Sequence, residues 1–228
     1  MIPVKEAKSI IHKHILLSGT ETVLLKDAGN RILAQDIIAT FPMPSFDNSA
    51  MDGFAVRAVD TKGTDQSLPV TLKMVGVSSA GSPGDITLGP GECAQCMTGA
   101  IIPNGADAIA MVEDTSGFSD TDSVQIFQEA KIGKHIRKKG EEIQDGDVLI
   151  PKGTHITPNE IGTLATFGYG EISVAQKPRI AIFGTGDELV EPGIELKLGQ
   201  IYNSNLYIFA ELAEKSGAEV VMRDVIKD

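Results

Sequence analysis

The sequence predicts a multidomain chain of mixed α+β and α/β class, because the pattern of predicted helices and strands changes twice along its 228 residues. A first region of helix and strand gives way to short β-rich runs separated by turn-forming clusters such as SSAGSPGD and TSGFSDTDS. A last region alternates an apolar strand, an amphipathic helix and a second strand, the pattern of a parallel α/β sheet. We therefore expect a helix-and-strand domain interrupted by an all-β insertion and followed by the start of an α/β domain.

The first domain is predicted to cover residues 1–45 and 136–176. Apolar residues recur near helical spacing in residues 3–17, PVKEAKSIIHKHILL, with lysines and a glutamate between them. The run TVLLK and the stretch DAGNRILAQDIIA then indicate a short strand and a helical turn that leads into another strand. The two prolines of FPMPS mark a boundary.

The returning part of this domain contains a strong helix-start pattern after the turn-rich stretch HIRKKGEEIQDGDVLIPKGTHIT. Thr157 is an N-cap residue, Pro158 suits the first helical position, and Glu160 completes a capping box. The helix continues through IGTLATFG and ends at Gly168 or Gly170. EISVAQ is then predicted to be a strand.

Residues 46–135 are predicted to form a compact all-β module. Its strands are short and its turns are long. The β-rich runs in this module are FAVRA, VTLKMVGV, ECAQCM, AIAMVED and SVQIFQ.

Residues 177–228 are predicted to form one βαβ unit with the usual right-handed crossover. RIAIFG is an apolar run typical of a strand buried on both faces of a parallel sheet. The following helix, SNLYIFAELAEKSG, can be capped by Asn203 or Ser204 and ended by Gly217, and AEVVMRDVI is the next strand. One such unit leaves apolar faces uncovered, so we expect the chain to be part of a longer protein or to be completed by another chain.

Composition and charge exclude several classes of function. The formal charge of −11 argues against nonspecific nucleic-acid binding, which needs clustered Lys and Arg. No apolar run approaches the ~20 residues of a membrane span, and MIPVKEAKSI lacks the layout of a signal peptide. We expect a cytoplasmic protein without nucleic-acid or membrane partners, whose acidic surface provides solubility or includes carboxylates that hold a divalent cation.

The two cysteines, Cys93 and Cys96, form a lone CAQC. A structural zinc site needs four ligands, and the four histidines do not lie at zinc-finger spacing. A redox CxxC normally opens a helix, whereas GECAQCMTG is predicted to be a strand that runs into a turn. We expect buried free thiols.

Five polar segments contain more functional groups than ordinary loops need. In chain order they are Asp47-Asn48-Ser49 with Asp52, Thr98 in MTGA, Arg137-Lys138-Lys139-Gly140-Glu141-Glu142, Gly184-Thr185-Gly186-Asp187-Glu188, and Asp228.

The glycine-bracketed GTGDE follows the first strand of the βαβ unit, where ligands bind in open α/β sheets. Because adjacent parallel strands lie ~4.8 Å apart, Asp187, Glu188 and Asp228 can lie close together, and such carboxylates suit Mg²⁺. The basic triplet of RKKG offers charge-assisted hydrogen bonds to an anion. A plain turn with solvated acids and a solvated basic turn remain alternative interpretations of these two segments.

Together and in this order, the segments resemble the molybdopterin molybdenumtransferase family, the MoeA-type proteins and the E domain of gephyrin. The resemblance covers nearly the whole chain. It rests on PSFDNSAMDGFAVRA, MTGAIIPNGADAIAMVED, IRKKGEEI, and FGTGDELVEPG with GQIYNSN.

The resemblance implies an enzyme of molybdenum cofactor biosynthesis. Family members insert molybdenum from molybdate into adenylylated molybdopterin and release AMP with the help of Mg²⁺, and a molybdopterin adenylyltransferase acts upstream. It also implies an elongated, dimer-forming domain I, an inserted β domain II and a pterin-binding domain III. Members are typically homodimers in which domain III of one subunit and domain II of the other form the cleft.

The same resemblance implies roles for individual residues. Glu142 stands where many members have aspartate, so its carboxylate is one methylene longer. The expected catalytic residues are Asp52, Thr98, Glu142, Glu188 and Asp228, the expected cofactor-binding residues are Ser49, Thr185, Gly186 and Arg137, and the expected metal ligands are Asp187, Glu188 and Asp228.

Two further expectations follow from the resemblance. The family's Ser-Gly-Gly phosphate loop lies downstream of Asp228, so we expect the 228-residue chain alone not to catalyse molybdenum insertion. Gephyrin-like members also bind partner peptides, so a non-catalytic scaffold is the alternative function. A scaffold has no need of Asp52, Glu188 and Asp228 together, and all three are present.

Overall fold

The computed structural model describes residues 2–15, 18–82, 84–118 and 122–226, so Asp228 lies outside the described residues. The chain forms two compact units, Met1–Ile37 with Val148–Asp228, and Ile38–Asp147. The chain contains α-helices together with both parallel and antiparallel strand pairs, so its class is mixed α+β. The finer division into domains I, II and III stays a prediction.

A five-stranded sheet with the strand order β7-β4-β6-β5-β8 dominates the unit Ile38–Asp147. All neighbouring strands in it are antiparallel except β5 and β6, which are parallel. The five strands correspond to the five β-rich runs predicted from the sequence. They are β4 (Gly53–Val56), β5 (Val70–Ser78), β6 (Glu92–Cys96), β7 (Ala108–Met111) and β8 (Ser123–Ile126).

Short elements complete this unit. The 3₁₀ turns η2 (Ala58–Thr61) and η3 (Val112–Asp114) follow strands β4 and β7. Strand β3 (Asn48–Ser49) pairs with β9 (Ile136–Arg137) in an antiparallel ribbon. No α-helix occurs in the described residues of this unit.

Strand β4 lies at the centre of the unit's core, and all four of its residues are buried. Because side chains alternate along a strand, Phe54 and Val56 pack into one apolar cluster and Ala55 packs into another. Cys93 and Cys96 of β6 fall in these two clusters as free thiols. The predicted buried free thiols are thus confirmed, and burial raises the pKa of Cys93 to about 12 and that of Cys96 to about 11.

The unit Met1–Ile37 with Val148–Asp228 contains a small core of its own. Strand β1 (Thr20–Leu24) pairs with β11 (Glu171–Ala175), and β2 (Ile37–Ile38) pairs with β10 (Val148–Ile150). The buried side chains around these strands are Ala28, Leu33, Ile37, Ile150, Ile156, Leu164, Ile172 and Val174.

The predicted capping box of α2 (Pro158–Thr166) is confirmed. The Thr157 side chain accepts a hydrogen bond from the Asn159 backbone N–H, and the Glu160 side chain accepts one from the Thr157 backbone N–H at 2.8 Å. Gly168, with a φ of 76°, ends the helix. The N-terminal helix α1 (Val4–His14) is also present, and none of its residues is buried.

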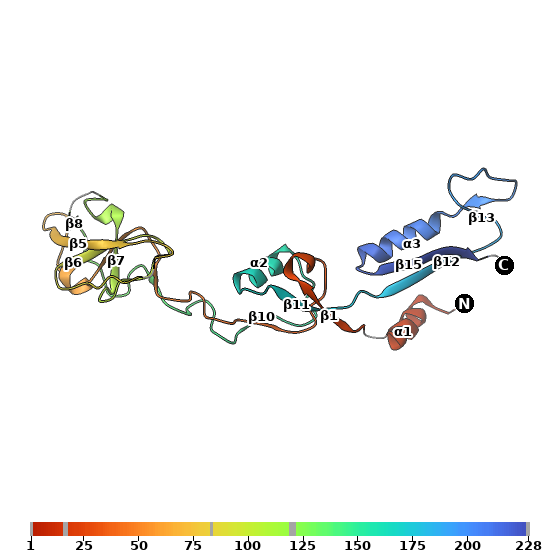
Figure 1. The fold of residues 1–228 in the computed structure, drawn as a ribbon, viewed down its shortest axis with the longest axis horizontal. Coiled ribbons are helices and arrows are strands. Elements are labelled where there is room, and N and C mark those ends of the chain that lie inside the picture. The colour runs from red at the N-terminus through yellow and green to blue at the C-terminus, as the bar shows by residue number, and fades with distance from the viewer. Residues whose placement is uncertain (1, 16–17, 83, 119–121, 227–228) are drawn as a thin grey trace. The chain divides into compact units, whose positions relative to one another are not determined.

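The βαβ unit is formed by β12 (Arg179–Thr185), α3 (Ser204–Lys215) and β15 (Glu219–Ile226). The two strands are parallel, as predicted, and α3 packs along both of them (Figure 1). Short strands β13 (Leu189–Val190) and β14 (Ile201–Tyr202) lie between β12 and α3 in the chain.

The prediction that RIAIFG is buried on both faces is wrong for the described chain. Residues of β12 alternate between exposed and half-buried. Within the described residues the sheet has two strands, β12 and β15, and α3 is the helix that packs against them. This cover is too small to bury both faces of β12. Among the helices of the described ranges, none is long and apolar enough to cross a membrane.

Gly53, the first residue of β4, is required by a close approach of two backbones. A Cβ atom at this position would lie 2.0 Å from the carbonyl oxygen of Ala110 on β7. A methyl group there would push β4 and the edge strand β7 apart. The glycine of the MDG motif is therefore a steric requirement of the sheet.

We predict that Gly53→Ala destabilises the unit Ile38–Asp147 by about 3 kcal/mol or more, because the strand pair cannot relax around a 2.0 Å overlap. Hydrogen exchange at the amides of β4 and β7 measures this loss. Gly162→Ala is the control, since a Cβ at Gly162 meets nothing within 4 Å. It is expected to raise the protection of α2 by about 0.5–1 kcal/mol. Unchanged protection of β4 and β7 in Gly53→Ala contradicts the steric argument.

Candidate functional site

Asp52 and Thr98, from two separate motifs, are in direct contact. The Asp52 Oδ1 atom accepts hydrogen bonds from the Thr98 backbone N–H at 2.7 Å and from the Thr98 hydroxyl at 2.8 Å. The contact follows from strand pairing. Asp52 directly precedes β4 and Thr98 follows β6, and these neighbouring antiparallel strands pair Gly53 with Cys96.

These two hydrogen bonds further favour the ionised form of Asp52. The Thr98 backbone N–H, followed by the Thr98 hydroxyl, lowers the pKa of the Asp52 carboxyl below its ordinary value. The side chain therefore remains an exposed anion at neutral pH. It can accept a proton or bind a cation, but it cannot serve as a general acid there.

Ser49 shapes the turn that leads to Asp52. It is buried, and its hydroxyl donates to the Met51 carbonyl at 2.6 Å and accepts from the Met51 N–H at 3.3 Å. Its backbone binds the MTGA segment on both sides, through Ser49 N–H to the Ala100 carbonyl and Gly99 N–H to the Ser49 carbonyl. These contacts hold the chain on either side of the Asp52–Thr98 pair.

Asp47 anchors the basic turn, a role that the sequence analysis did not assign to it. Its carboxylate accepts from the Lys138 Nζ at 2.7 Å and from the Lys139 backbone N–H at 2.8 Å. Lys138, followed by the Lys139 N–H, lowers the pKa of Asp47. Glu141 accepts from the Lys138 N–H at 2.8 Å and closes the turn. The complementary charges of FDNS and RKKG were the signal available in the sequence.

Three of the five predicted segments therefore meet in one unit. The stretch 47–52 is bonded to the MTGA segment through Ser49 and to the basic segment through Asp47. The Ala50 N–H donates to the carbonyl of His135, two residues before the basic segment. Arg137 lies opposite Asn48 in the β3–β9 ribbon, and both Arg137 and Glu142 are exposed. This short stretch therefore contains the exposed Asp52 carboxylate and, through Asp47, holds the exposed basic turn.

The GTGDE segment lies at the carboxyl end of β12, as predicted. Thr185 pairs with Ile226 of β15, and the Gly186 N–H donates to the Ile226 carbonyl at 3.2 Å. The two strand ends are therefore adjacent up to Ile226. A Cβ at Gly186 would lie 2.4 Å from a Glu188 carboxylate oxygen, so glycine at this φ of 138° lets Glu188 fold back over the turn.

The donor set at this strand end fits a magnesium ion that is shared with a substrate. Asp187 and Glu188 are both exposed. Within the part of the chain that the structure describes, no three His, Cys, Asp or Glu side chains are gathered as a metal site. Mg²⁺ is commonly held by one or two carboxylates together with substrate phosphates and water, which is what Asp187 and Glu188 can provide.

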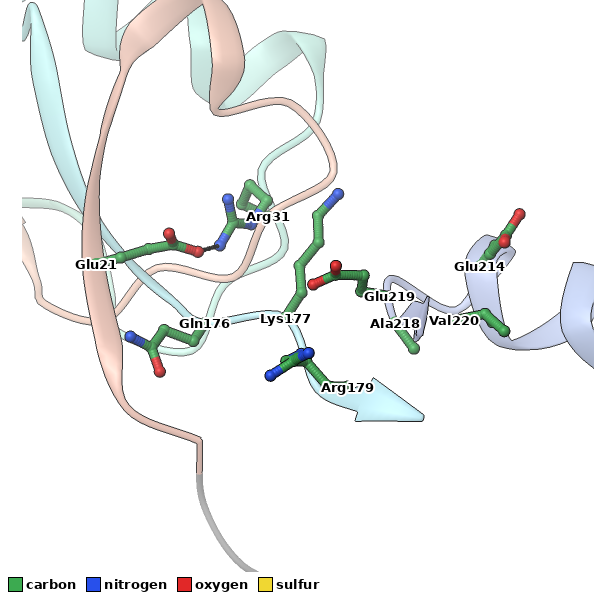
Figure 2. Close-up of a pocket in the computed structure, with 9 residues that line it drawn as sticks. All are labelled: Glu21, Arg31, Gln176, Lys177, Arg179, Glu214, Ala218, Glu219 and Val220. Atoms are coloured by element: carbon green, nitrogen blue, oxygen red, sulfur yellow. Dashed lines mark hydrogen bonds and ion pairs between the residues drawn. The ribbon is translucent and has the colours of Figure 1, made fainter. Parts of the chain in front are cut away.

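A different cavity contains none of the predicted residues. It has a volume of about 790 Å³ and mixes three carboxylates with three cations (Figure 2). Arg31 is paired with Glu21 and also donates to the Ala175 carbonyl at 2.7 Å. The balanced charges favour neither an anion nor a cation, so this cavity is a weaker candidate than the strand ends.

The Asp52–Thr98 contact predicts a measurable titration. In Thr98→Val the hydroxyl donor is lost and the backbone donor stays, so the pKa of Asp52 rises toward its ordinary value without reaching it. ¹³C NMR titration of the carboxyl group checks this. Thr115→Val is the control, because the Thr115 hydroxyl donates to the Val112 carbonyl instead. An unchanged Asp52 titration in Thr98→Val contradicts the contact.

Comparison with known proteins agrees with this arrangement of motifs. The family model described as the MoeA N-terminal region (domain I and II) matches residues 2–168. A molybdopterin molybdenumtransferase of Staphylococcus aureus is 41% identical over 227 residues, which is 100% of this chain and 54% of that protein. One of Bacillus subtilis is 39% identical over 229 residues, 100% of this chain and 53% of that protein. The chain thus spans about half the length of these relatives.

Solved structures agree with the sequence comparison. A molybdopterin biosynthesis MoeA protein from Pyrococcus horikoshii OT3 matches with a TM-score of 0.91 and 32% identity, covering 100% of this chain and 60% of that one. A second structure of a Pyrococcus MoeA protein matches with a TM-score of 0.87 and 34% identity, covering 100% and 58%. The chain therefore belongs to the MoeA family, whose N-terminal region it contains.

Proposed function

We propose that the protein containing this chain acts in molybdenum cofactor biosynthesis and inserts molybdenum from molybdate into adenylylated molybdopterin, with release of AMP. Its relatives are named molybdopterin molybdenumtransferases. The observation that carries the proposal is the Asp52–Thr98 contact, which joins two motifs 46 positions apart through one exposed carboxylate.

The described residues offer the two kinds of chemistry that the reaction needs. Molybdate is a dianion, and the exposed side chains of Arg137 and Lys139 supply cationic donors. Substrate phosphates bound with Mg²⁺ need carboxylates, which Asp187 and Glu188 supply at the end of β12, joined in our proposal by Asp228. When bound, the metal ion neutralises phosphoryl charge. Glu142 and Thr185 are proposed to flank these two groups.

The remaining expectations belong to the same proposal. We place the reaction in the cytoplasm, in a homodimer whose cleft is shared between subunits, downstream of a molybdopterin adenylyltransferase. The 228-residue chain alone is proposed not to complete the reaction, because its relatives are about twice as long.

The test uses the full-length protein and the substitution Asp52→Asn, which keeps the shape of the side chain and removes its charge. We expect AMP release from adenylylated molybdopterin in the presence of molybdate and Mg²⁺ to fall about 10²–10⁴-fold, the usual contribution of a catalytic carboxylate. Formation of molybdenum cofactor is measured in parallel.

Asp65→Asn is the matched control. Asp65 is also an exposed carboxylate with a lowered pKa, and it accepts from the Ser67 N–H and hydroxyl in a local turn. Its loss is expected to leave AMP release near the wild-type rate. Wild-type AMP release in Asp52→Asn overturns the proposed role of Asp52, whereas absence of AMP release in the full-length wild-type protein overturns the proposed reaction and favours the scaffold function. AMP release by the 228-residue chain alone overturns only its expected inactivity.

A further inference from the structure

Asn203 presents an unsatisfied buried donor at the start of α3. Its Oδ1 atom accepts from the Leu206 N–H at 3.3 Å, which caps the helix and fixes the orientation of the amide. The Nδ2 atom therefore faces away from the helix. The residue is 3% exposed, and among the described residues Nδ2 has no hydrogen-bond partner. Buried donors without partners are rare in native proteins, so this one calls for an acceptor.

The amide of Asn203 lies over the GTGDE segment. A Cβ atom at Gly184 would lie 3.2 Å from Nδ2, so any larger residue at this position would crowd the amide. Asn203, Gly184, Thr185 and Glu188 line one cavity of about 350 Å³, to which Ser204 and Asn205 of the first turn of α3 also contribute. The unpaired donor and the predicted ligand-binding turn therefore belong to the same cavity.

The cavity's donors suit an anion. α3 has 12 residues, no acidic side chain in its first turn, and first-turn N–H groups that give its N-terminus partial positive charge. The Thr185 and Ser204 hydroxyls add further donors among the lining residues. Glu188 is the one carboxylate in this lining, which is where a divalent cation shared with phosphate oxygens fits.

We infer that Asn203 and the N-terminus of α3 bind a phosphate or diphosphate group of the substrate beside Glu188. This inference rests on the proposed function, since an adenylylated substrate contains such a group. Asn203 thus has two roles, capping α3 through its oxygen and binding the anion through its nitrogen. The glycine at position 184 leaves room for the amide.

The first experiment uses the ¹⁵N-labelled wild-type chain and inorganic pyrophosphate, with and without Mg²⁺. We expect the side-chain amide signals of Asn203 and the backbone amides of the first turn of α3 to shift as pyrophosphate is added. The absence of any shift up to millimolar pyrophosphate overturns the inference.

The second experiment separates the two roles of Asn203. Asn203→Asp and Asn203→Ser keep an oxygen that can cap the helix and remove the amide donor. We expect pyrophosphate binding, measured by calorimetry, to weaken at least about tenfold in both, while hydrogen exchange shows that α3 is retained. Asn159→Asp is the matched control for charge, because Asn159 is exposed in the first turn of α2. Its binding is expected to equal that of the wild type.

The outcomes of these tests are independent of the activity test. Equal binding by the wild type and by the Asn203→Ser variant overturns the inference and leaves the proposed reaction standing. If the full-length wild-type protein releases no AMP while pyrophosphate binding depends on Asn203, the binding site stands and the proposed reaction falls. If either Asn203 variant loses α3, the shifts in the wild-type chain decide.

Discussion

The antiparallel pairing of β4 with β6 is the constraint on which the candidate site depends. It places the residue before Gly53 beside the residues that follow Cys96, and so brings Asp52 to Thr98. The pairing of β4 with β7 on its other side leaves no room for a side chain at Gly53. One glycine and one strand register therefore determine where the exposed carboxylate lies. The stretch FDNSAMDG contains both the steric requirement and the chemical group, which accounts for its unusual density of polar atoms.

The two units of the chain carry different functional groups. One unit provides an ionised carboxylate, Asp52, and a basic turn that Asp47 holds in shape. The other provides carboxylates and N–H donors at the ends of a parallel strand and a helix. A reaction between an oxyanion and a phosphate-linked substrate needs both sets, because the dianion and the metal-bound phosphates require ligands of opposite charge. Acidic and basic motifs on separate loops are the expected arrangement for such a reaction.

Features encoded by neighbouring residues were predictable from the sequence. The Thr157 capping box, the five β-rich runs and the caps of α3 each depend on residues a few positions apart, so spacing alone identifies them. The contact between Asp47 and Lys138 joins residues 91 positions apart and depends on the β3–β9 pairing, which local pattern does not reveal. The burial of β12 was mispredicted because an apolar run reports the tendency of a strand to be covered, and the described partners cover it incompletely. The unpaired Asn203 nitrogen could not be foreseen either, since the sequence indicates a cap without showing where its second atom points.

The central claim, that Asp52 and Thr98 act as one unit in the reaction, is tested most directly by a double-mutant cycle of AMP release in the full-length protein. The four proteins are wild type, Asp52→Asn, Thr98→Val and the double variant. If Thr98 acts through Asp52, Thr98→Val lowers the rate in the wild type and adds no further loss once Asp52 is neutral. Losses that add fully in the double variant would show that the two residues act separately and would contradict the account.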